Sequence, residues 1–284
     1  MEKKYSFKKL WKTITGDGQL FAGVIGILLL LLLIVLAPVV ATENPYHFGK
    51  DVLVGLGERG HILGTNHMGQ DIYSMVVYGV RTSVQVAVIS ALISGILGVL
   101  IGGVAGFFGG KVDTVISEII NVFMMLPSFF LILLVIALFG NSLYNVMVVI
   151  GITTWPSNAK LMRAQALSLR ERTFVKSATA MGETKFQILF KYIIPNGIFP
   201  VIANTTMGMS NAILTEAGLS FLGLGDPGII SWGQMIYTGK QYITTAWWIS
   251  VFAGIAIVLT VLVFYLLGDG LNHVLNPKHM NGRE

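Results

Sequence analysis

The stretch Lys160–Lys191 reads KLMRAQALSLRERTFVKSATAMGETKFQILFK and separates two long apolar parts of the chain. After Lys160 it has no proline and only one glycine, Gly182, and its first half is dominated by good helix formers. It holds seven basic residues, namely Lys160, Arg163, Arg170, Arg172, Lys176, Lys185 and Lys191. A basic, helix-forming segment between apolar runs is expected on the cytoplasmic side of a membrane, and this one is large enough to bind a partner.

The rest of the chain is too apolar for a soluble domain. Hydrophobic residues make up 54% of it and charged residues 12%, and the mean hydropathy is +0.74; soluble domains average roughly 25% charged residues. Uncharged windows cover residues 18–42, 82–110, 119–159, 192–215 and 241–268. A membrane span needs about 20 apolar residues, so the third window has room for two, divided at the turn-like Gly140-Asn141-Ser142. We therefore predict spans at 20–41, 84–108, 119–139, 143–159, 196–218 and 246–268.

These spans predict an all-α polytopic membrane protein with six transmembrane helices and both termini in the cytoplasm. Fifteen basic residues fall on the side of the termini and the basic segment, and four fall on the other side, which sets this orientation. The first apolar stretch is longer than a signal-peptide core, and we interpret it as a retained anchor. The predicted parts are a cytoplasmic segment 1–19, a first transmembrane helix 20–41, an extracytoplasmic loop 42–82, and a core 83–284 with the cytoplasmic loop 160–195.

The composition also argues against several kinds of chemistry. Without cysteine the chain has no disulfide, thiolate metal site or cysteine nucleophile. It has no G-x-x-x-x-G-K-[ST] motif, so it does not bind ATP in the P-loop manner. Its net charge of +5 comes from basic residues beside the spans and does not indicate nucleic acid binding. His61 and His67 do not have the spacing of a helical ligand pair, and we predict no catalytic residue and no metal site.

The second half of the basic segment predicts an elbow between two short helices. Gly182 is suited to end one helix and let another begin at a sharp angle, and Pro195 suits the first turn of the next membrane helix. Small residues at Ser177, Ala178 and Ala180 allow close approach of a partner. The alternative is a solvated basic loop beside anionic lipid.

This elbow resembles the cytoplasmic coupling loop of bacterial ABC importer permeases, in which Glu-Ala-Ala is followed by Gly and then Pro. Lys176-Ser177-Ala178, Gly182 and Pro195 occupy those positions. Lys176 replaces the usual Glu, so any salt link made by that Glu does not carry over. The spacing from Gly to Pro is kept.

Five further blocks extend the resemblance to the oligopeptide, dipeptide and nickel branch of this family. They are His61–Asp71, Tyr78–Ser83, Gly106–Asp113, Ser220–Gly225 with Ser231-Trp232-Gly233, and Leu267–Leu271 with Asn276-Pro277. The first block departs from the family pattern at Asn66, which replaces Asp, and at Gln70, which replaces Arg. The blocks occur in the family's order and at its spacing, so the chain is identified as a member.

The resemblance implies a type I permease fold and a transport subunit that works with others. The expected partners are a second, similar permease, two separate ATPase subunits that bind ATP and magnesium, an extracytoplasmic solute-binding protein and the bilayer. ATPase closure would move the basic segment and, through it, the spans. The residues expected to couple the two are Lys176, Ser177, Ala178, Met181, Gly182 and Glu183. Their alternative role is packing within the permease.

The external loop is expected to dock the solute-binding protein, with Asp71 and Trp232 as candidate contacts. Trp232 and Tyr237 are alternatively aromatic residues of the membrane interface. Glu216 lies near the outer end of the fifth predicted span, where an acid usually faces a cavity or a partner. It either borders the translocation path or pairs with a cation of the partner permease, or it already lies in the external loop.

The predicted function is therefore a permease of an ATP-driven importer for short peptides in the cytoplasmic membrane of a bacterium or archaeon. A nickel or metal-chelate importer of the same family is the alternative, because substrate choice belongs largely to the binding protein. A stand-alone channel or secondary carrier is more distant, since it would need no basic helical segment. A membrane-embedded enzyme would need several convergent acids or histidines within the spans, and only Glu216 comes near.

Overall fold

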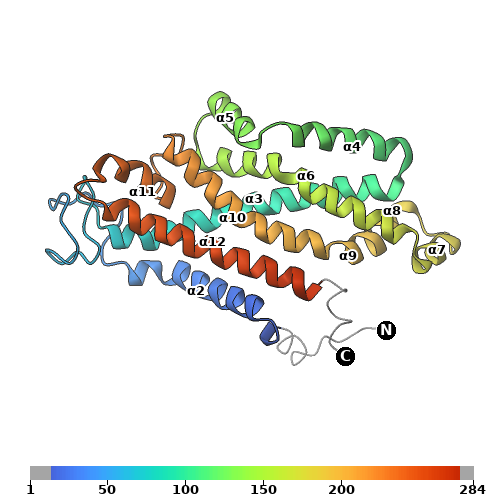
Figure 1. Ribbon diagram of the computed structural model, residues 1–284, viewed down its shortest axis with the longest axis horizontal. Coiled ribbons are helices and arrows are strands. Elements are labelled where there is room, and N and C mark those ends of the chain that lie inside the picture. The colour runs from blue at the N-terminus through green and yellow to red at the C-terminus, as the bar shows by residue number, and fades with distance from the viewer. Residues whose placement is uncertain (1–13, 276–284) are drawn as a thin grey trace.

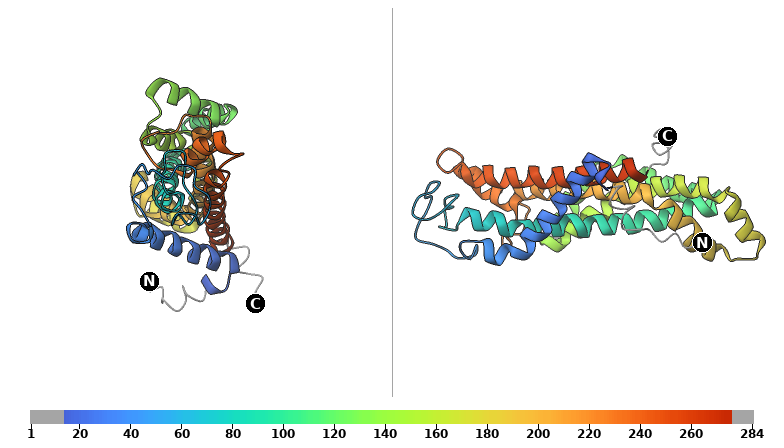
Figure 2. Two further views of the ribbon diagram at one scale, coloured as in Figure 1. Left: turned by 90° about the vertical axis from the view of Figure 1, so that its left-hand side faces the viewer. Right: turned by 90° about the horizontal axis from the view of Figure 1, so that it is seen from below.

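The computed structural model describes residues 14–275 and shows an elongated bundle of helices that share one long axis (Figure 1). The long helices run along this axis, with the loop before α3 at one end of the bundle and α7 at the other (Figures 1 and 2). Within the described residues, the one β pairing is an isolated bridge between Thr65 and Asp71. The predicted all-α fold is confirmed.

Helix α2 (Gly18–Val40) matches the first predicted span and packs along α12 (Trp248–Leu275). Asp17 caps α2 by accepting a hydrogen bond from the backbone N–H of Leu20 at 2.9 Å. The backbones of the two helices approach closely, since a Cβ on Gly23 would lie 2.5 Å from the backbone nitrogen of Leu267. The start of α2 and the end of α12 also adjoin, because Asp17 Oδ2 lies 3.6 Å from His273 Nδ1.

Helix α3 (Ile72–Phe108) has 37 residues and begins twelve residues before the predicted span. The last eleven residues of the predicted loop 42–82 are therefore helical. Small residues let α3 pack tightly against α6: a Cβ on Gly98, Gly102 or Gly106 would lie 2.2–2.4 Å from atoms of that helix. These glycines therefore serve close contact between the two helices.

The predicted span 119–139 is not one straight helix. The chain forms α4 (Gly110–Met125) and α5 (Ser128–Phe139), which meet at an angle of 84°. The bend follows from Pro127, because a proline forces the preceding residue out of the helical region. Leu126 accordingly has φ −82° and ψ 130°.

Helix α6 (Leu143–Arg170) extends the predicted span 143–159 by eleven residues. The first half of the basic segment is thus the end of the long helix α6 and not a separate helix. Residues 160–170 contain nothing that stops a helix, and the chain turns only at Glu171 and Arg172. Because residues 160–170 continue α6, the region of short helices around Gly182 is shorter than predicted.

The remaining elements follow the predicted order. Short helices α7 (Thr173–Ala180), α8 (Lys185–Ile188) and α9 (Ile194–Gly197), the last two joined by a π-helical turn at Leu189–Ile193, lead into α10 (Phe199–Phe221). Pro195 lies in the first turn of α9 and not of the long helix. Helix α11 (Trp232–Gly239) and a short 3₁₀ turn (Lys240–Tyr242) connect α10 to α12.

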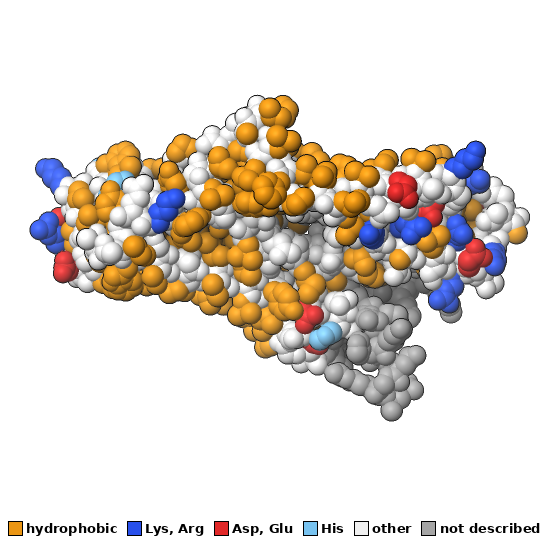
Figure 3. Space-filling view, turned by 45° about the horizontal axis from the view of Figure 1, so that its top comes forward, with side chains coloured by type: hydrophobic (Ala, Val, Ile, Leu, Met, Phe, Trp, Pro, Cys, Tyr) orange, Lys and Arg blue, Asp and Glu red, His pale blue; other side chains and the backbone are white. Residues whose placement is uncertain are grey.

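Composition supports fewer crossings than predicted. In the described residues, α2, α3 and α12 are each long and apolar enough to cross a membrane, and two bent helix pairs bring the number to as many as five. Helix α6 is not among them, so six crossings stay a prediction. The space-filling view shows Lys and Arg toward the two ends of the molecule and an apolar zone between them (Figure 3). The lysines before residue 14 and the basic residues after 275, on which the orientation partly rests, lie outside the described residues.

Candidate functional site

The elbow at Gly182 is built by hydrogen bonds that end α7. The N–H of Gly182 donates to the carbonyl of Thr179 at 3.0 Å, and the N–H of Glu183 donates to the carbonyl of Ala178 at 3.2 Å. This pair of bonds is a Schellman motif, which needs a left-handed residue after the helix. Gly182 has φ +84°, so the prediction that it ends a helix is confirmed.

The predicted coupling residues form an exposed cap at this end of the bundle. Lys176, Ser177, Met181 and Gly182 are exposed, and Met181 leaves 72% of its surface free. Ala178 differs, because it is buried in the cluster of apolar side chains that holds α7 against α6 and α8. Large apolar side chains beside the predicted set, Phe174 and Phe186, are exposed as well. Sequence spacing alone does not single out these two phenylalanines.

Charge within the cap is paired locally. Lys176, which replaces the family's Glu, lies 3.3 Å from Glu171 Oε2. Glu183 accepts a hydrogen bond from the Tyr192 hydroxyl at 2.7 Å and lies 3.2 Å from Lys191 Nζ. The hydrogen bond from Tyr192, together with the nearby ammonium of Lys191, lowers the pKa of Glu183. These contacts fix the elbow to the helices that follow it.

The end of α6 is tied to the preceding helices. Arg163 donates to both carboxylate oxygens of Asp113 on α4, with Nη2 to Oδ2 at 2.7 Å. Arg170 Nη1 donates to the carbonyl of Gly106 near the end of α3 at 3.4 Å. Asp113 therefore links α4 to α6 structurally. The partner of Asp113, fifty residues away, carries no signal in the sequence.

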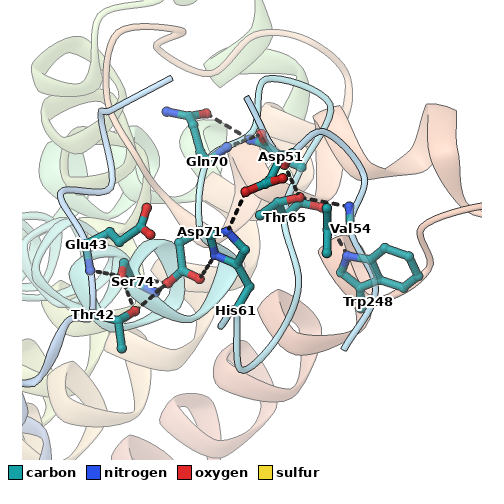
Figure 4. A network of polar contacts seen from close by, with 11 residues as sticks. Thr42, Glu43, Asp51, Val54, His61, Thr65, Gln70, Asp71, Ser74 and Trp248 are labelled. Atoms are coloured by element: carbon teal, nitrogen blue, oxygen red, sulfur yellow. Dashed lines mark hydrogen bonds and ion pairs between the residues drawn. The ribbon is translucent and has the colours of Figure 1, made fainter. Parts of the chain in front are cut away.

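At the opposite end, Asp71 organises the loop before α3, which is predicted to be external (Figure 4). It caps α3 by accepting from the N–H of Ser74 at 2.9 Å, and it also accepts from the hydroxyls of Ser74 and Thr42. His61 Nδ1 lies 3.0 Å from Asp71 Oδ1. Burial raises the pKa of Asp71, but these hydrogen bonds outweigh it and hold the pKa below its usual value. The network joins the end of α2, the loop and the start of α3.

Two buried tryptophans hold the same region together. Trp232 Nε1 donates to the carbonyl of Val76 at 2.9 Å, and Trp248 Nε1 donates to the carbonyl of Thr65 at 3.1 Å. Asp71 and Trp232 leave only 1% and 2% of their surfaces exposed. Neither side chain is therefore placed to touch a docked protein directly, and any part they play in docking acts through the shape of the loop.

Glu216 is buried within the chain, with 3% of its surface exposed. Its Oε1 accepts hydrogen bonds from the hydroxyls of Ser220 and Ser231, both at 2.8 Å. Ser231 also caps α11. Glu216 thus links α10 to α11, and it does not line the polar cavity in the middle of the bundle.

Comparison with known proteins identifies the kind of molecule to which this arrangement belongs. Residues 98–280 match the family described as "Binding-protein-dependent transport system inner membrane component". The chain belongs to this family. Its members are permease subunits of ABC transporters, whose ATPase site lies in separate subunits, so the chain is a transport subunit and not an enzyme.

Relatives match the permease along nearly its whole length. The dipeptide transport system permease protein DppC of Alkalihalophilus pseudofirmus is 34% identical over 276 residues, which cover 96% of this chain and 90% of the relative. The glutathione transport system permease protein GsiD of Pectobacterium atrosepticum is 35% identical over 256 residues, covering 88% and 85%. Among solved structures, an inward-facing MetNI methionine ABC transporter matches with a TM-score of 0.55 at 19% identity, covering 70% of this chain and 96% of that one. That likeness supports the fold of the permease.

Proposed function

We propose that this permease imports dipeptides and short oligopeptides across the cytoplasmic membrane of a bacterium or archaeon. The observation that carries the proposal is the match to dipeptide, di/tripeptide and glutathione permeases over most of both chains. These relatives give the nickel alternative no comparable support. A stand-alone channel is not supported either, because the matching family is binding-protein-dependent.

The transport cycle divides between this chain and its partners. A solute-binding protein delivers peptide to the end that carries the external loop, and two ATPase subunits bind ATP and magnesium at the end that carries α7. A second, similar permease completes the membrane channel. The supporting geometry is that these two ends lie at opposite limits of the bundle (Figure 1).

The exposed cap supplies the contact with an ATPase subunit. Met181 and Phe186 offer apolar surface outside the membrane zone, where an exposed group of large apolar residues usually marks a protein interface. Lys176, Ser177, Gly182 and Glu183 surround this apolar centre, and buried Ala178 fixes α7 beneath it. Movement of the ATPase dimer is passed to the spans by rigid-body displacement of this cap.

The test is ATP-dependent peptide uptake by the complete complex in proteoliposomes, with binding protein and a labelled dipeptide. The proposal predicts uptake that needs ATP, and no uptake when the ATPase subunits are omitted. Met181→Glu should separate the ATPase from the permease. Met68→Glu, at an exposed methionine of the external loop, is the matched control and should leave the ATPase bound. Uptake without any ATPase would contradict the proposal and favour a carrier.

A further inference from the structure

A polar cavity of about 420 Å³ lies between α3, α6, α10 and the bend that joins α4 to α5. Its volume is within the range of about 300–1,000 Å³ found for small-molecule sites. Ten of its nineteen lining residues carry a hydroxyl or amide side chain, and none is charged. The residues that matter below are Ser94, Thr153, Asn158, Asn204, Thr205 and Asn211.

The depth of the cavity makes its polarity unusual. Ser94 lies well inside the 37-residue α3, and Asn158 lies well inside the 28-residue α6. At such depth, polar groups turned toward lipid are costly, and they normally face a water-filled space or another part of the protein. A polar cavity at this level therefore belongs to a route through the membrane more naturally than to the lipid-facing surface.

A ladder of side-chain amides fixes the wall of the cavity. Asn204 Nδ2 donates to Asn158 Oδ1 at 2.8 Å, and Asn158 Nδ2 donates to Ser94 Oγ at 3.0 Å. Asn158 itself is only 2% exposed, so it is held rigidly between α3 and α10. The ladder joins three helices and orients Asn204 at the cavity.

Several polar groups of the wall remain available. The Thr205 hydroxyl has no hydrogen-bond partner in the described part of the chain, but its oxygen is buried and so is not one of the groups open to the cavity. The Thr153 hydroxyl donates to its own helix at Val149, so its oxygen is left to accept. Asn211 is exposed and brings both an amide donor and a carbonyl acceptor. The wall therefore offers donors and acceptors together, without a fixed charge.

We propose that this cavity binds the main-chain amides of a peptide as it passes through the permease. A peptide backbone alternates N–H donors with C=O acceptors, which is the pattern that asparagine and hydroxyl side chains complement. An uncharged wall makes no distinction between acidic and basic side chains, so it suits substrates of varied sequence. The inference rests on the proposed peptide importer and assigns to it a substrate site in this subunit.

The chain offers a matched control beside the cavity. A second groove, of about 430 Å³, also lies between α3 and α10, but apart from two threonines its lining is apolar. Leu92 lines this groove and is exposed. It lies on the same helix as Ser94, yet it should face lipid or an apolar partner.

The experiment uses the absence of native cysteine. Asn211→Cys and Leu92→Cys are each introduced into the full complex, which is reconstituted and treated with a membrane-impermeant, positively charged thiol reagent. We expect modification of Asn211→Cys, slowed about tenfold by an excess of transported dipeptide, as for a site that is mostly occupied. Leu92→Cys should be modified slowly and without any effect of peptide.

A second variant reads selectivity directly. Asn211→Asp places a carboxylate in the wall, and it should lower the ratio of acidic-dipeptide to basic-dipeptide transport by about fivefold to tenfold relative to the wild-type complex. The binding protein is the same in both complexes, so its own preference cancels. A change that merely disturbed packing would slow both peptides alike.

The outcomes separate this inference from the proposed function. If the wild-type complex transports peptide but Asn211→Cys is unreactive, or is not protected by peptide, the cavity is filled by a partner or unused, and the inference is overturned. An unchanged acidic-to-basic ratio in Asn211→Asp overturns it as well. If the wild-type complex transports no peptide, the proposed function is overturned instead. The proposal that the cavity binds a peptide then falls with it.

Discussion

Arg163 on α6 donates two hydrogen bonds to Asp113 on α4 and so ties the beginning of the basic segment to the helix that follows α3. Both side chains are mostly buried, with 33% and 18% of their surfaces exposed. A two-pronged contact between a guanidinium and a carboxylate fixes geometry as well as charge. The cap at α7 therefore follows a helix, α6, whose end is attached to α4 through Arg163 and to α3 through Arg170.

Removing the charge of Asp113 should destabilise the permease. Asp113→Asn leaves Arg163 without its carboxylate, and we expect a loss of about 1.5–3 kcal/mol, the range for hydrogen bonds to charged groups. Thermal unfolding of the purified complex measures it. Ser117→Ala, which removes a longer 3.4 Å contact to the same carboxylate, is the control and should cost much less. Equal losses in the two variants would contradict the importance of the ion pair.

Asp71 should make the external loop sensitive to acid. Its folded pKa lies below the ordinary value of 3.8, so its contribution to stability is fully present above that value and is lost as the pH falls through the folded pKa. The difference in melting temperature between wild type and Asp71→Asn should then be constant near neutral pH and shrink below about pH 4. Val52→Ala, an exposed change in the same loop, should show no such trend. A difference that grows on acidification would have the wrong sign.

Gly182→Ala should strain the elbow without a steric clash. No atom lies within 4 Å of the position of the new Cβ, so the cost comes from φ +84° and amounts to about 1 kcal/mol. Peptide-stimulated ATPase activity should fall because the cap loses its shape. Gly182→Asn should recover most of it, because Asn tolerates the left-handed region. Equal activity in the Ala and Asn variants would show that backbone conformation is not the cause.

Lys176→Glu restores the family's usual residue and tests what its replacement does. The pair with Glu171 is exposed, so its loss should change stability by less than about 1 kcal/mol. We nevertheless expect ATPase activity in the complex to fall, because the variant places two acids at the cap. The double swap Glu171→Lys with Lys176→Glu restores the local pair. If the double swap also restores ATPase activity, Lys176 serves only Glu171 and makes no contact with the ATPase.

The apolar windows of the sequence predict most of the long helices, because long uncharged runs report burial in lipid directly. Helices α2, α10 and α12 lie where expected. The start of α3 is not predicted, because a charged residue at Arg81 suggests a loop. In the structure Arg81 Nε donates to the carbonyl of Ile34 on α2 at 2.9 Å, so a charged residue fits inside the helix. Such a partner, 47 residues away, is not visible in a local window.

Two other wrong helix boundaries arise where the sequence contains the right signal but another signal is preferred. The break in the third window is predicted at Gly140, whereas Pro127 makes a second one, with a bend of 84°. The end of α6 is predicted just before Lys160, because the first charge suggests a change of element. The Gly182 elbow is predicted correctly because its signal is local: a single glycine is enough to end the helix before it. The networks around Asp71 and Asn158 depend on contacts between distant segments and carry no local signal.

Helix α6 is one continuous helix that holds both Asn158 of the amide ladder and the basic residues up to Arg170. Asn158 and Arg170 are twelve residues apart on it, or about 18 Å at 1.5 Å per residue, and the proline of this helix, Pro156, lies before both. The helix has no proline and no break between Asn158 and Arg170 that could absorb a displacement. We therefore expect a tilt applied at Arg170 to be passed along α6 to Asn158 and to move the wall of the cavity proposed to bind peptide.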